Sequence, residues 1–152
     1  MANYYGHTRT NYFRVTDAGR LKQIIDSARS GEDTISLFQR TIGDEIYYGF
    51  GCHDSISGLC ENWEQPNACN NTDELDDDEP CFDLFIEELS EILHPDDAII
   101  ITEIGYEKLR YLIAWSVVIT RNDSFYIDLR SASLQKARDM LQNPGWNTAM
   151  EY

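Results

Sequence analysis

The feature that most constrains the fold is a run of large apolar residues at helical spacing between residues 80 and 93. A helix with one buried face has apolar side chains at positions i, i+3, i+4 and i+7. The residues that follow this spacing here are Phe82, Phe85, Ile86, Leu89, Ile92 and Leu93. Pro80 and the acidic residues before it suit a helix start, where proline fits and the dipole favours negative charge. The pattern predicts a helix over 80–93 that packs on a core.

The rest of the chain predicts an α+β fold. Alternating or continuous apolar patterns bounded by turn residues are typical of strands, and they occur at 11–17, 34–42, 45–52, 98–105, 110–120 and 125–130. Helical spacing and capping residues predict two more helices, one capped by Thr16 or Asp17 and ending near Ala28, the other at 131–141, capped by Ser131 or Ser133. The order is β-α-β-β-α-β-β-β-α. It favours a mostly antiparallel sheet of about six strands, with three helices on one face.

Several details of this fold are also predicted. Gly43 and Asp44 form a tight turn between two strands. Residues 107–129 form a central antiparallel hairpin, because "RYLIAWSVVIT" is apolar on both faces. Residues 51–80 are rich in Gly, Ser, Asn, Asp and Pro, and they predict an irregular, acidic insert rich in Cys and Asn. The length of 152 residues suits a single domain over 1–152.

Charge is distributed very unevenly. The formal net charge is −15, yet residues 41–107 contain 19 Asp and Glu and no Lys or Arg, while the flanks carry all 12 basic residues. Such asymmetry predicts one acidic face, and the net charge disfavours direct binding to nucleic acid or to an anionic membrane. No apolar leader opens the chain and no apolar run is long enough for a membrane span, so a cytoplasmic location in the host cell is expected.

The acidic charge is densest at 73–93, which holds ten acidic residues and no basic one. On the predicted helix, acidic residues at i, i+4 and i+8 lie opposite the apolar stripe and repel one another. We interpret this block as a partner-binding surface, formed by Asp73, Glu74, Asp76, Asp77, Asp78, Glu79, Asp83, Glu87, Glu88 and Glu91. A purely solvating role for these carboxylates is the alternative.

Nothing in the sequence specifies catalysis or a cofactor. The cysteines, Cys52, Cys60, Cys69 and Cys81, lack CxxC spacing and are predicted to be free thiols, with a zinc site or disulfides as alternatives. The "DELDDDE" segment lacks the glycine and the final glutamate of an EF-hand loop. Cys52 and His53 are adjacent on a strand and point to opposite faces, which does not make a dyad. No catalytic residue, metal or cofactor is therefore assigned.

The first strand mixes aromatic and basic residues. Tyr4, Tyr5 and Tyr12 are interleaved with Arg9 and Arg14. In a basic protein such a pattern would favour base stacking. In this acidic chain we expect the tyrosines to cover a sheet edge and the arginines to pair with nearby carboxylates.

Two motifs carry a resemblance to a known group of proteins. The opening YYGxxRTNYFRVxD, from Tyr4 to Asp17, and "EKLRYL" at 107–112 resemble segments of small acidic accessory proteins carried by phages and plasmids. The resemblance implies an origin in a mobile element. It also implies a possible counter-defence role, such as that of anti-CRISPR or anti-restriction inhibitors, several of which mimic DNA. It carries over no catalytic residue.

The function that these patterns favour is a non-enzymatic inhibitor. It would present an acidic, nucleic-acid-like face to a basic nucleic-acid-binding protein or complex, without binding nucleic acid or membrane itself. A generic acidic protein–protein adaptor, and a metal-dependent or thiol-dependent enzyme, are the alternatives.

Overall fold

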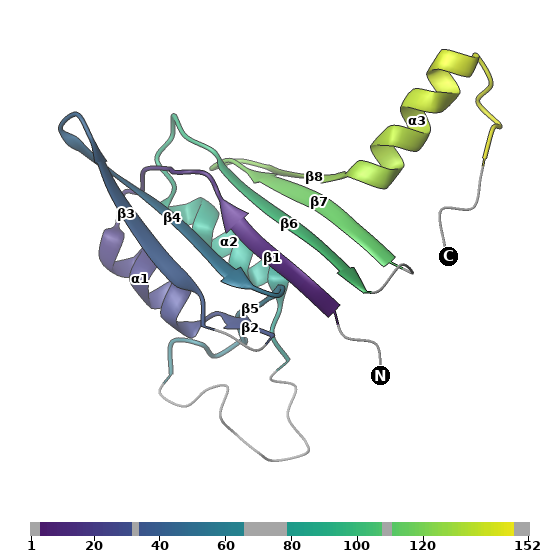
Figure 1. Cartoon of the computed structure of the whole chain (residues 1–152). Helices are drawn as coiled ribbons and strands as arrows, with labels where there is room; N and C mark the ends of the chain where they lie inside the picture. The colour runs from purple at the N-terminus through teal and green to yellow at the C-terminus, as the bar shows by residue number, and fades with distance from the viewer. Residues whose placement is uncertain (1–3, 32–33, 66–78, 108–110, 148–152) are drawn as a thin grey trace.

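The computed structural model describes residues 4–31, 34–65, 79–107 and 111–147 (Figure 1). The elements follow the order β1 (Tyr4–Thr10), α1 (Ala18–Ser27), β2 (Arg29–Ser30), β3 (Ser36–Ile42), β4 (Glu45–His53), β5 (Ile56–Gly58), α2 (Phe82–Ile92), β6 (Ile99–Glu107), β7 (Tyr111–Ile119), β8 (Ser124–Asp128) and α3 (Leu129–Leu141).

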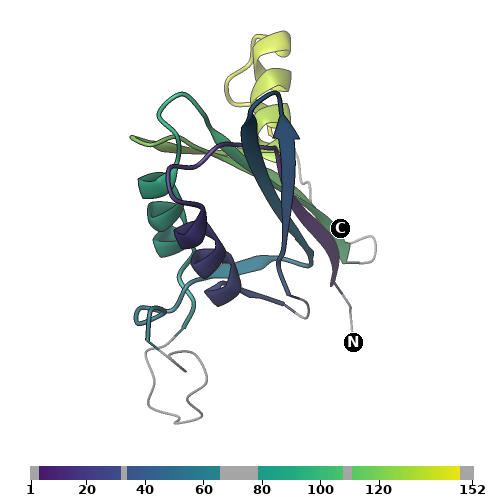
Figure 2. The same cartoon turned by 90° about the vertical axis from the view of Figure 1, so that its left-hand side faces the viewer.

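The architecture is a six-stranded antiparallel sheet with helices on one face. The strand order is β3-β4-β1-β6-β7-β8, and β2 pairs with β5 in a separate two-stranded sheet. Viewed edge-on, the sheet forms one layer and α1 and α2 form the other (Figure 2). The third helix, α3, continues beyond the sheet from the end of β8 (Figure 1). The predicted α+β class and the antiparallel sheet are confirmed, whereas only α1 and α2, and not α3, lie on the face where three helices were predicted (Figure 1, Figure 2).

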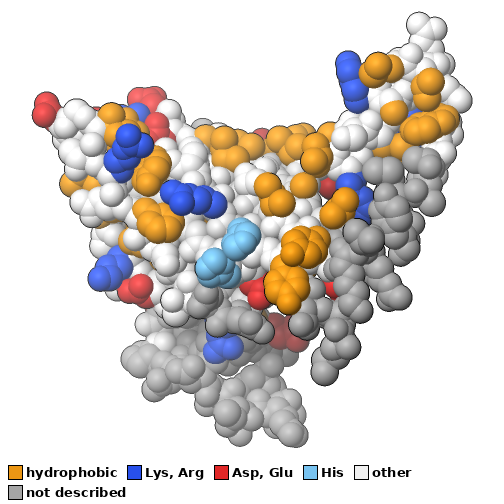
Figure 3. Space-filling model, viewed as in Figure 1, with side chains coloured by type: hydrophobic (Ala, Val, Ile, Leu, Met, Phe, Trp, Pro, Cys, Tyr) orange, Lys and Arg blue, Asp and Glu red, His pale blue; other side chains and the backbone are white. Residues whose placement is uncertain are grey.

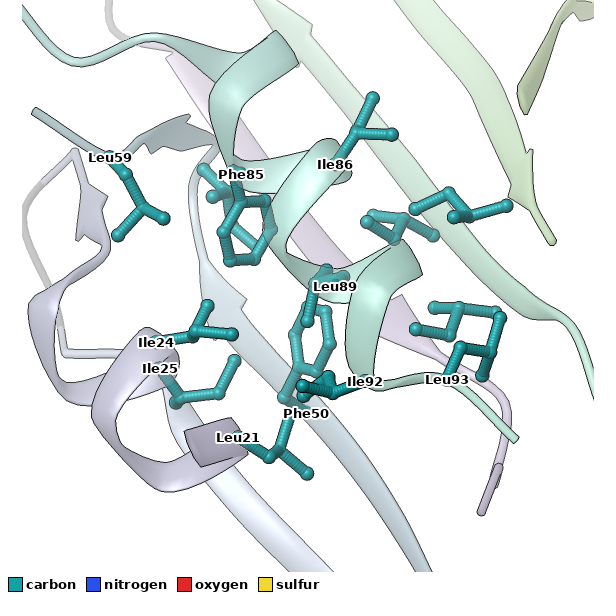
Figure 4. Close-up of a cluster of buried hydrophobic side chains, with 14 of the residues drawn as sticks. Leu21, Ile24, Ile25, Phe50, Leu59, Phe85, Ile86, Leu89, Ile92 and Leu93 are labelled. Carbon is teal, nitrogen blue, oxygen red and sulfur yellow. The ribbon is translucent and has the colours of Figure 1, made fainter. Parts of the chain in front are cut away.

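The core lies between the sheet and the two covering helices. The apolar stripe of α2 contributes Phe85 and Leu89, which face Phe50 of β4, and α1 contributes Leu21 and Ile24 from the other side (Figure 4). The rings of Phe50 and Phe85 meet edge to face, with centroids 5.8 Å apart, an arrangement that aromatic pairs prefer. The helix predicted from the apolar spacing is thus present, and it buries the face that the spacing indicated.

Local signals at turns and caps were also informative. The Asp17 side chain accepts a hydrogen bond from the Arg20 amide at 3.0 Å and caps α1, as predicted. Gly43 has a φ of 64° in the predicted turn between β3 and β4, where a left-handed backbone suits glycine. The capping of α3 differs from the prediction. Asp128, and neither Ser131 nor Ser133, is its N-cap, and its side chain accepts from the Arg130 amide.

The first strand lies earlier than predicted. It spans Tyr4–Thr10, whereas Phe13 and Val15 form only isolated bridges, to Tyr48 and Leu93 respectively. The apolar alternation at 11–17 comes from Phe13, which is fully buried in an irregular segment. The inward positions of β1 are polar or lack a side chain, so β1 itself shows no apolar alternation. This strand pairs with both β4 and β6, so its tyrosines do not cover an edge.

Two further predictions, the central position of the 107–129 hairpin and the irregular insert at 51–80, are wrong in detail. The strand β7 is second from the edge, and the centre of the sheet is the β1–β6 pair. The predicted irregular insert at 51–80 is partly ordered, since Ile56–Gly58 forms β5 and Leu59 and Trp63 join the core. Apolar residues this widely spaced give no periodic signal, so only the tertiary contacts identify them as core. Residues 66–78 of the insert lie outside the described residues.

An ion-pair cluster fixes the irregular segment after β1. Arg14 donates from Nε and Nη2 to the two carboxylate oxygens of Asp97, each at 3.0 Å, and from Nη1 to Glu45 at 3.0 Å. The Arg14 backbone amide also donates to Asp97, at 2.8 Å. The expectation that the arginines pair with nearby carboxylates is confirmed for Arg14, whereas Arg9 lies over the Phe38 ring, 4.7 Å from its centroid. These hydrogen bonds hold the pKa of Asp97 below its usual value.

Replacement of Asp97 by Asn is expected to destabilise the fold more at pH 7 than in acid. A carboxyl group with a lowered folded-state pKa stabilises the protein above its unfolded pKa of about 3.9. That stabilisation is lost as the pH falls through the folded value. Urea unfolding at pH 7 and near pH 3 should therefore show a gap between wild type and Asp97→Asn that shrinks in acid. The exposed neighbour Asp96 gives the control Asp96→Asn, and an equal pH dependence of both variants would contradict this account.

Candidate interaction surface

The acidic face of α2 is built by the same spacing that buries its apolar face. Because Phe85, Ile86 and Leu89 point into the core, the side chains at 83, 87 and 91 point outward, and Asp83, Glu87 and Glu91 are exposed. Successive members are one helical turn apart, with a rise of about 6 Å per step. The last turn contains no basic residue, although the helix dipole favours positive charge there. The arrangement is therefore mildly unfavourable for the isolated fold.

No described ion pair neutralises these three carboxylates. The ion pairs within the described ranges involve Arg14 and Arg20, and their acidic partners are Glu45, Asp97, Glu64 and Glu88. Asp83 does interact with the Tyr126 hydroxyl of β8, whose pKa is raised by burial and by this carboxylate. The three residues, hereafter the acidic stripe, thus form a linear array of negative charge on the helix layer.

Glu88 does not belong to the acidic stripe. Its side chain is only 18% exposed, and its carboxylate accepts from Arg20 Nη2 at 3.2 Å. Arg20 also pairs with Glu64 and lies 4.4 Å from the centroid of the Trp63 ring. Glu88 therefore joins α2 to α1 and to the segment before residue 66. One position along the helix turns this side chain from solvent toward α1, and the role of Glu88 in partner binding stays a prediction.

The remaining predicted carboxylates are only partly placed. Glu79 is exposed just before α2. Asp73, Glu74, Asp76, Asp77 and Asp78 lie outside the described residues, so their place relative to the acidic stripe stays a prediction.

The cysteines differ from the prediction that all are free thiols. Cys60 is disulfide-bonded and fully buried, whereas neither Cys52 nor Cys81 forms a disulfide. Sequence spacing does not report the distance between two Cβ atoms, which decides whether a disulfide can form. Within the described ranges no group of three or more His, Cys, Asp or Glu side chains could hold a metal.

The predicted separation of Cys52 from His53 is confirmed. Cys52 packs against the core, while the ring of His53 is exposed and meets that of His7, with the two Nδ1 atoms 3.0 Å apart. The two histidines are cross-strand partners of β1 and β4. The thiol and the imidazole of this pair therefore lie on opposite faces of the sheet.

A buried carboxylate in the sheet was not identified from the sequence. Glu103 of β6 is 5% exposed and accepts hydrogen bonds from the Tyr4 hydroxyl at 3.2 Å and from Trp115 Nε1 at 3.1 Å. Burial and this carboxylate raise the pKa of Tyr4 to about 12. The strand alternation of "IIITEIGYE" places Glu103 on the same face as the buried Ile101, and this was the signal available in the sequence.

The face of the sheet that points away from α1 and α2 was also missed. Large apolar side chains gather there over β6, β7 and β8, with His and basic side chains over the neighbouring strands (Figure 3). The most exposed are Ile104 at 62% and Phe125 at 68%. The sequence pattern "RYLIAWSVVIT" contained this signal, because a strand apolar on both faces must have a second apolar environment.

The fold defines this chain only as an α+β protein in which helices cover one face of the sheet and no described helix covers the other (Figure 2). Comparisons with protein-family models, with curated proteins and with solved structures each gave no match. No helix in the described ranges is both long enough and apolar enough to cross a membrane.

Proposed function

We propose that this protein is a non-enzymatic inhibitor that binds a basic, nucleic-acid-handling protein or complex through the acidic stripe. The observation that carries the proposal is the exposure of Asp83, Glu87 and Glu91 in a row without an ion-pair partner among the described residues. A counter-defence role in a host cytoplasm, of the anti-CRISPR or anti-restriction kind, is the form of this function that the mobile-element resemblance favours.

The physical argument rests on charge spacing. The acidic stripe places carboxylates at steps of about 6 Å along a rigid helix, and each strand of B-DNA places phosphates at about 3.4 Å along the axis. Glu79, three residues before the start of α2, is a further exposed carboxylate. A groove lined by Lys and Arg that normally holds a nucleic-acid backbone would meet a comparable row of negative charge on α2. Binding of this kind gains in association rate and specificity from complementary charge.

The acidic stripe destabilises the helix that carries it, so its presence supports a role in binding. Like charges at i and i+4 destabilise a helix by a few tenths of a kcal/mol per pair, and Glu87 and Glu91 face the unfavourable end of the dipole. Arg20 shows that the fold can neutralise a carboxylate on this helix, since it pairs with Glu88. The absence of an ion pair to the other three among the described residues is consistent with a partner that supplies the positive charge.

The double substitution Glu87→Lys/Glu91→Lys is expected to abolish partner capture while leaving the fold intact. Both side chains are exposed, and their reversal removes like-charge repulsion along α2. The measurement is capture from a nuclease-treated bacterial lysate on immobilised protein, followed by mass spectrometry. Partners held by wild type should be lost from the variant, should be eluted by salt, and should be released by added DNA.

The matched control is Asp26→Lys/Asp96→Lys, which changes the net charge equally at exposed positions outside the acidic stripe. Glu88 is left unchanged in both variants because of its structural pairing with Arg20. Equal capture by wild type, variant and control would show that the acidic stripe is solvated surface only. Direct binding of the wild type to DNA in a gel-shift assay would also contradict the proposal.

A further inference from the structure

The helix α3 has no buried residue although it is 13 residues long. Figure 1 shows it leaving the sheet at the end of β8 and running away from the body. Its apolar residues Leu129, Met140 and Leu141 are exposed, Met140 at 75%. Helices of this length are marginal in water, and in proteins most of their stability comes from packing. Within the described ranges no residue of α3 is fully buried and these three side chains stay exposed, so a packing surface for them must come from elsewhere.

A second uncovered apolar surface lies beside it, on the open face of the sheet. The register of the strands places its members next to one another, since Tyr5 pairs with Tyr106 and Tyr106 with Leu112. We define the outer apolar face as Tyr5, Ile104, Tyr106, Leu112, Phe125 and Ile127, all of which are exposed. Antiparallel sheets with one solvated face normally place polar residues there. A contiguous exposed apolar patch is typical of an interaction site.

The outer apolar face and the exposed apolar side of α3 meet near the first residues of α3. A pocket of about 440 Å³ lies there. Its lining includes Leu112, Ala114 and Ile127 of the outer face, Phe82, Trp115 and Tyr126 of the helix-covered side, and Arg130 at the start of α3. Figure 3 shows apolar side chains on the sheet on one side of this region and on α3 on the other. An apolar occupant of the outer apolar face would therefore also be in reach of α3.

The distribution of charge restricts what can cover these surfaces. The chain carries a net charge of −15, so two copies repel one another over most of their surface. Yet the outward-facing positions described on β1, β6, β7 and β8 include no Asp or Glu, and they include His7 and Arg9. Three basic residues and a single acidic one, Asp139, lie on α3. This is the side on which two copies can approach with the least electrostatic cost.

We propose that the protein forms a twofold symmetric dimer in which the outer apolar face and α3 of each copy cover those of the other. A twofold axis requires a patch that complements itself, and both unpartnered apolar surfaces occur once on every chain and lie side by side. The dimer buries the exposed apolar side chains of the sheet and supplies the packing that α3 lacks. It leaves the acidic stripe, on the opposite layer, free on both copies. The inference does not depend on the proposed function.

Sedimentation velocity of the full chain between about 1 and 100 μM tests the dimer, since this range brackets micromolar dissociation constants. The mass is expected to rise from the 17.6 kDa of one chain to twice that value. Two variants place carboxylates in the interface, Ile104→Glu/Phe125→Glu on the sheet and Met140→Glu/Leu141→Glu on α3. Each should raise the dissociation constant by at least about 100-fold, because burying unpaired charge is strongly unfavourable.

The control Gln23→Glu/Gln65→Glu adds the same charge at exposed positions away from the open sheet face and should leave the dimer intact. Circular dichroism reports whether each variant folds. A measurement on the wild type alone tests the dimer even if a variant does not fold. Hydrogen exchange of the α3 amides should slow as the protein concentration rises. A wild type that stays monomeric throughout overturns the proposal. So does a dimer that survives either interface variant, or α3 exchange that does not change with concentration.

Discussion

Replacing Phe85 by alanine is expected to lower the free energy of unfolding by about 3–5 kcal/mol, which is the range for large-to-small substitutions at buried aromatic positions. Phe85 is fully buried, and its ring contacts those of Phe50 and Phe82, with centroids 5.8 and 5.9 Å away. The loss combines the transfer of the ring to water with a cavity that the sheet and α2 cannot close. For a chain of this length the melting temperature should fall by roughly 10 °C.

The control Phe85→Leu should lose less stability, because leucine refills part of the cavity with apolar volume. Thermal unfolding by circular dichroism and chemical unfolding in urea measure both variants. An unchanged melting temperature for Phe85→Ala would mean that α2 does not pack on the sheet through this residue, and the orientation of the acidic stripe would be wrong with it.

Replacing Gly58 by alanine is expected to destabilise the protein by roughly 2–6 kcal/mol, from about 1–3 kcal/mol of backbone strain and a similar steric cost. Gly58 ends β5 with a φ of 120°, a conformation that residues with a Cβ rarely adopt. A Cβ at this position would lie 2.6 Å from the Phe82 amide nitrogen and closer still to the Cys81 carbonyl. The contact would push the start of α2 away from β5.

Gly19→Ala is the matched control. Gly19 lies inside α1 and has only an ordinary contact, 3.5 Å from the Asp17 side chain, so alanine should stabilise the helix by up to about 1 kcal/mol. The two variants make the same chemical change and should move the urea midpoint in opposite directions. A Gly58→Ala variant as stable as wild type would show that the approach of β5 to α2 is looser than the structure has it.

The sequence determined the elements whose side chains are periodic. The spacing of Phe85, Ile86 and Leu89 fixed α2 and its buried face, and from it followed the outward direction of Glu87 and Glu91. The Asp17 cap and the turn at Gly43 were readable because each satisfies a local backbone requirement. Such features depend on residues a few positions apart, so the sequence alone carries them.

Tertiary structure decided everything that depends on which distant residues meet. Glu88 and Glu87 are adjacent and chemically alike, and only the position of Arg20 on α1 makes one structural and leaves the other exposed. The strand β1 lay outside the predicted segment because its inward positions, Gly6, Thr8 and Thr10, give no apolar alternation, and only its pairing with the distant strands β4 and β6 identifies it as a strand. The open apolar face exists because nothing in the described ranges packs on β6, β7 and β8 opposite α2. A sequence pattern gives the faces of a strand, but the global packing decides whether a second layer covers them.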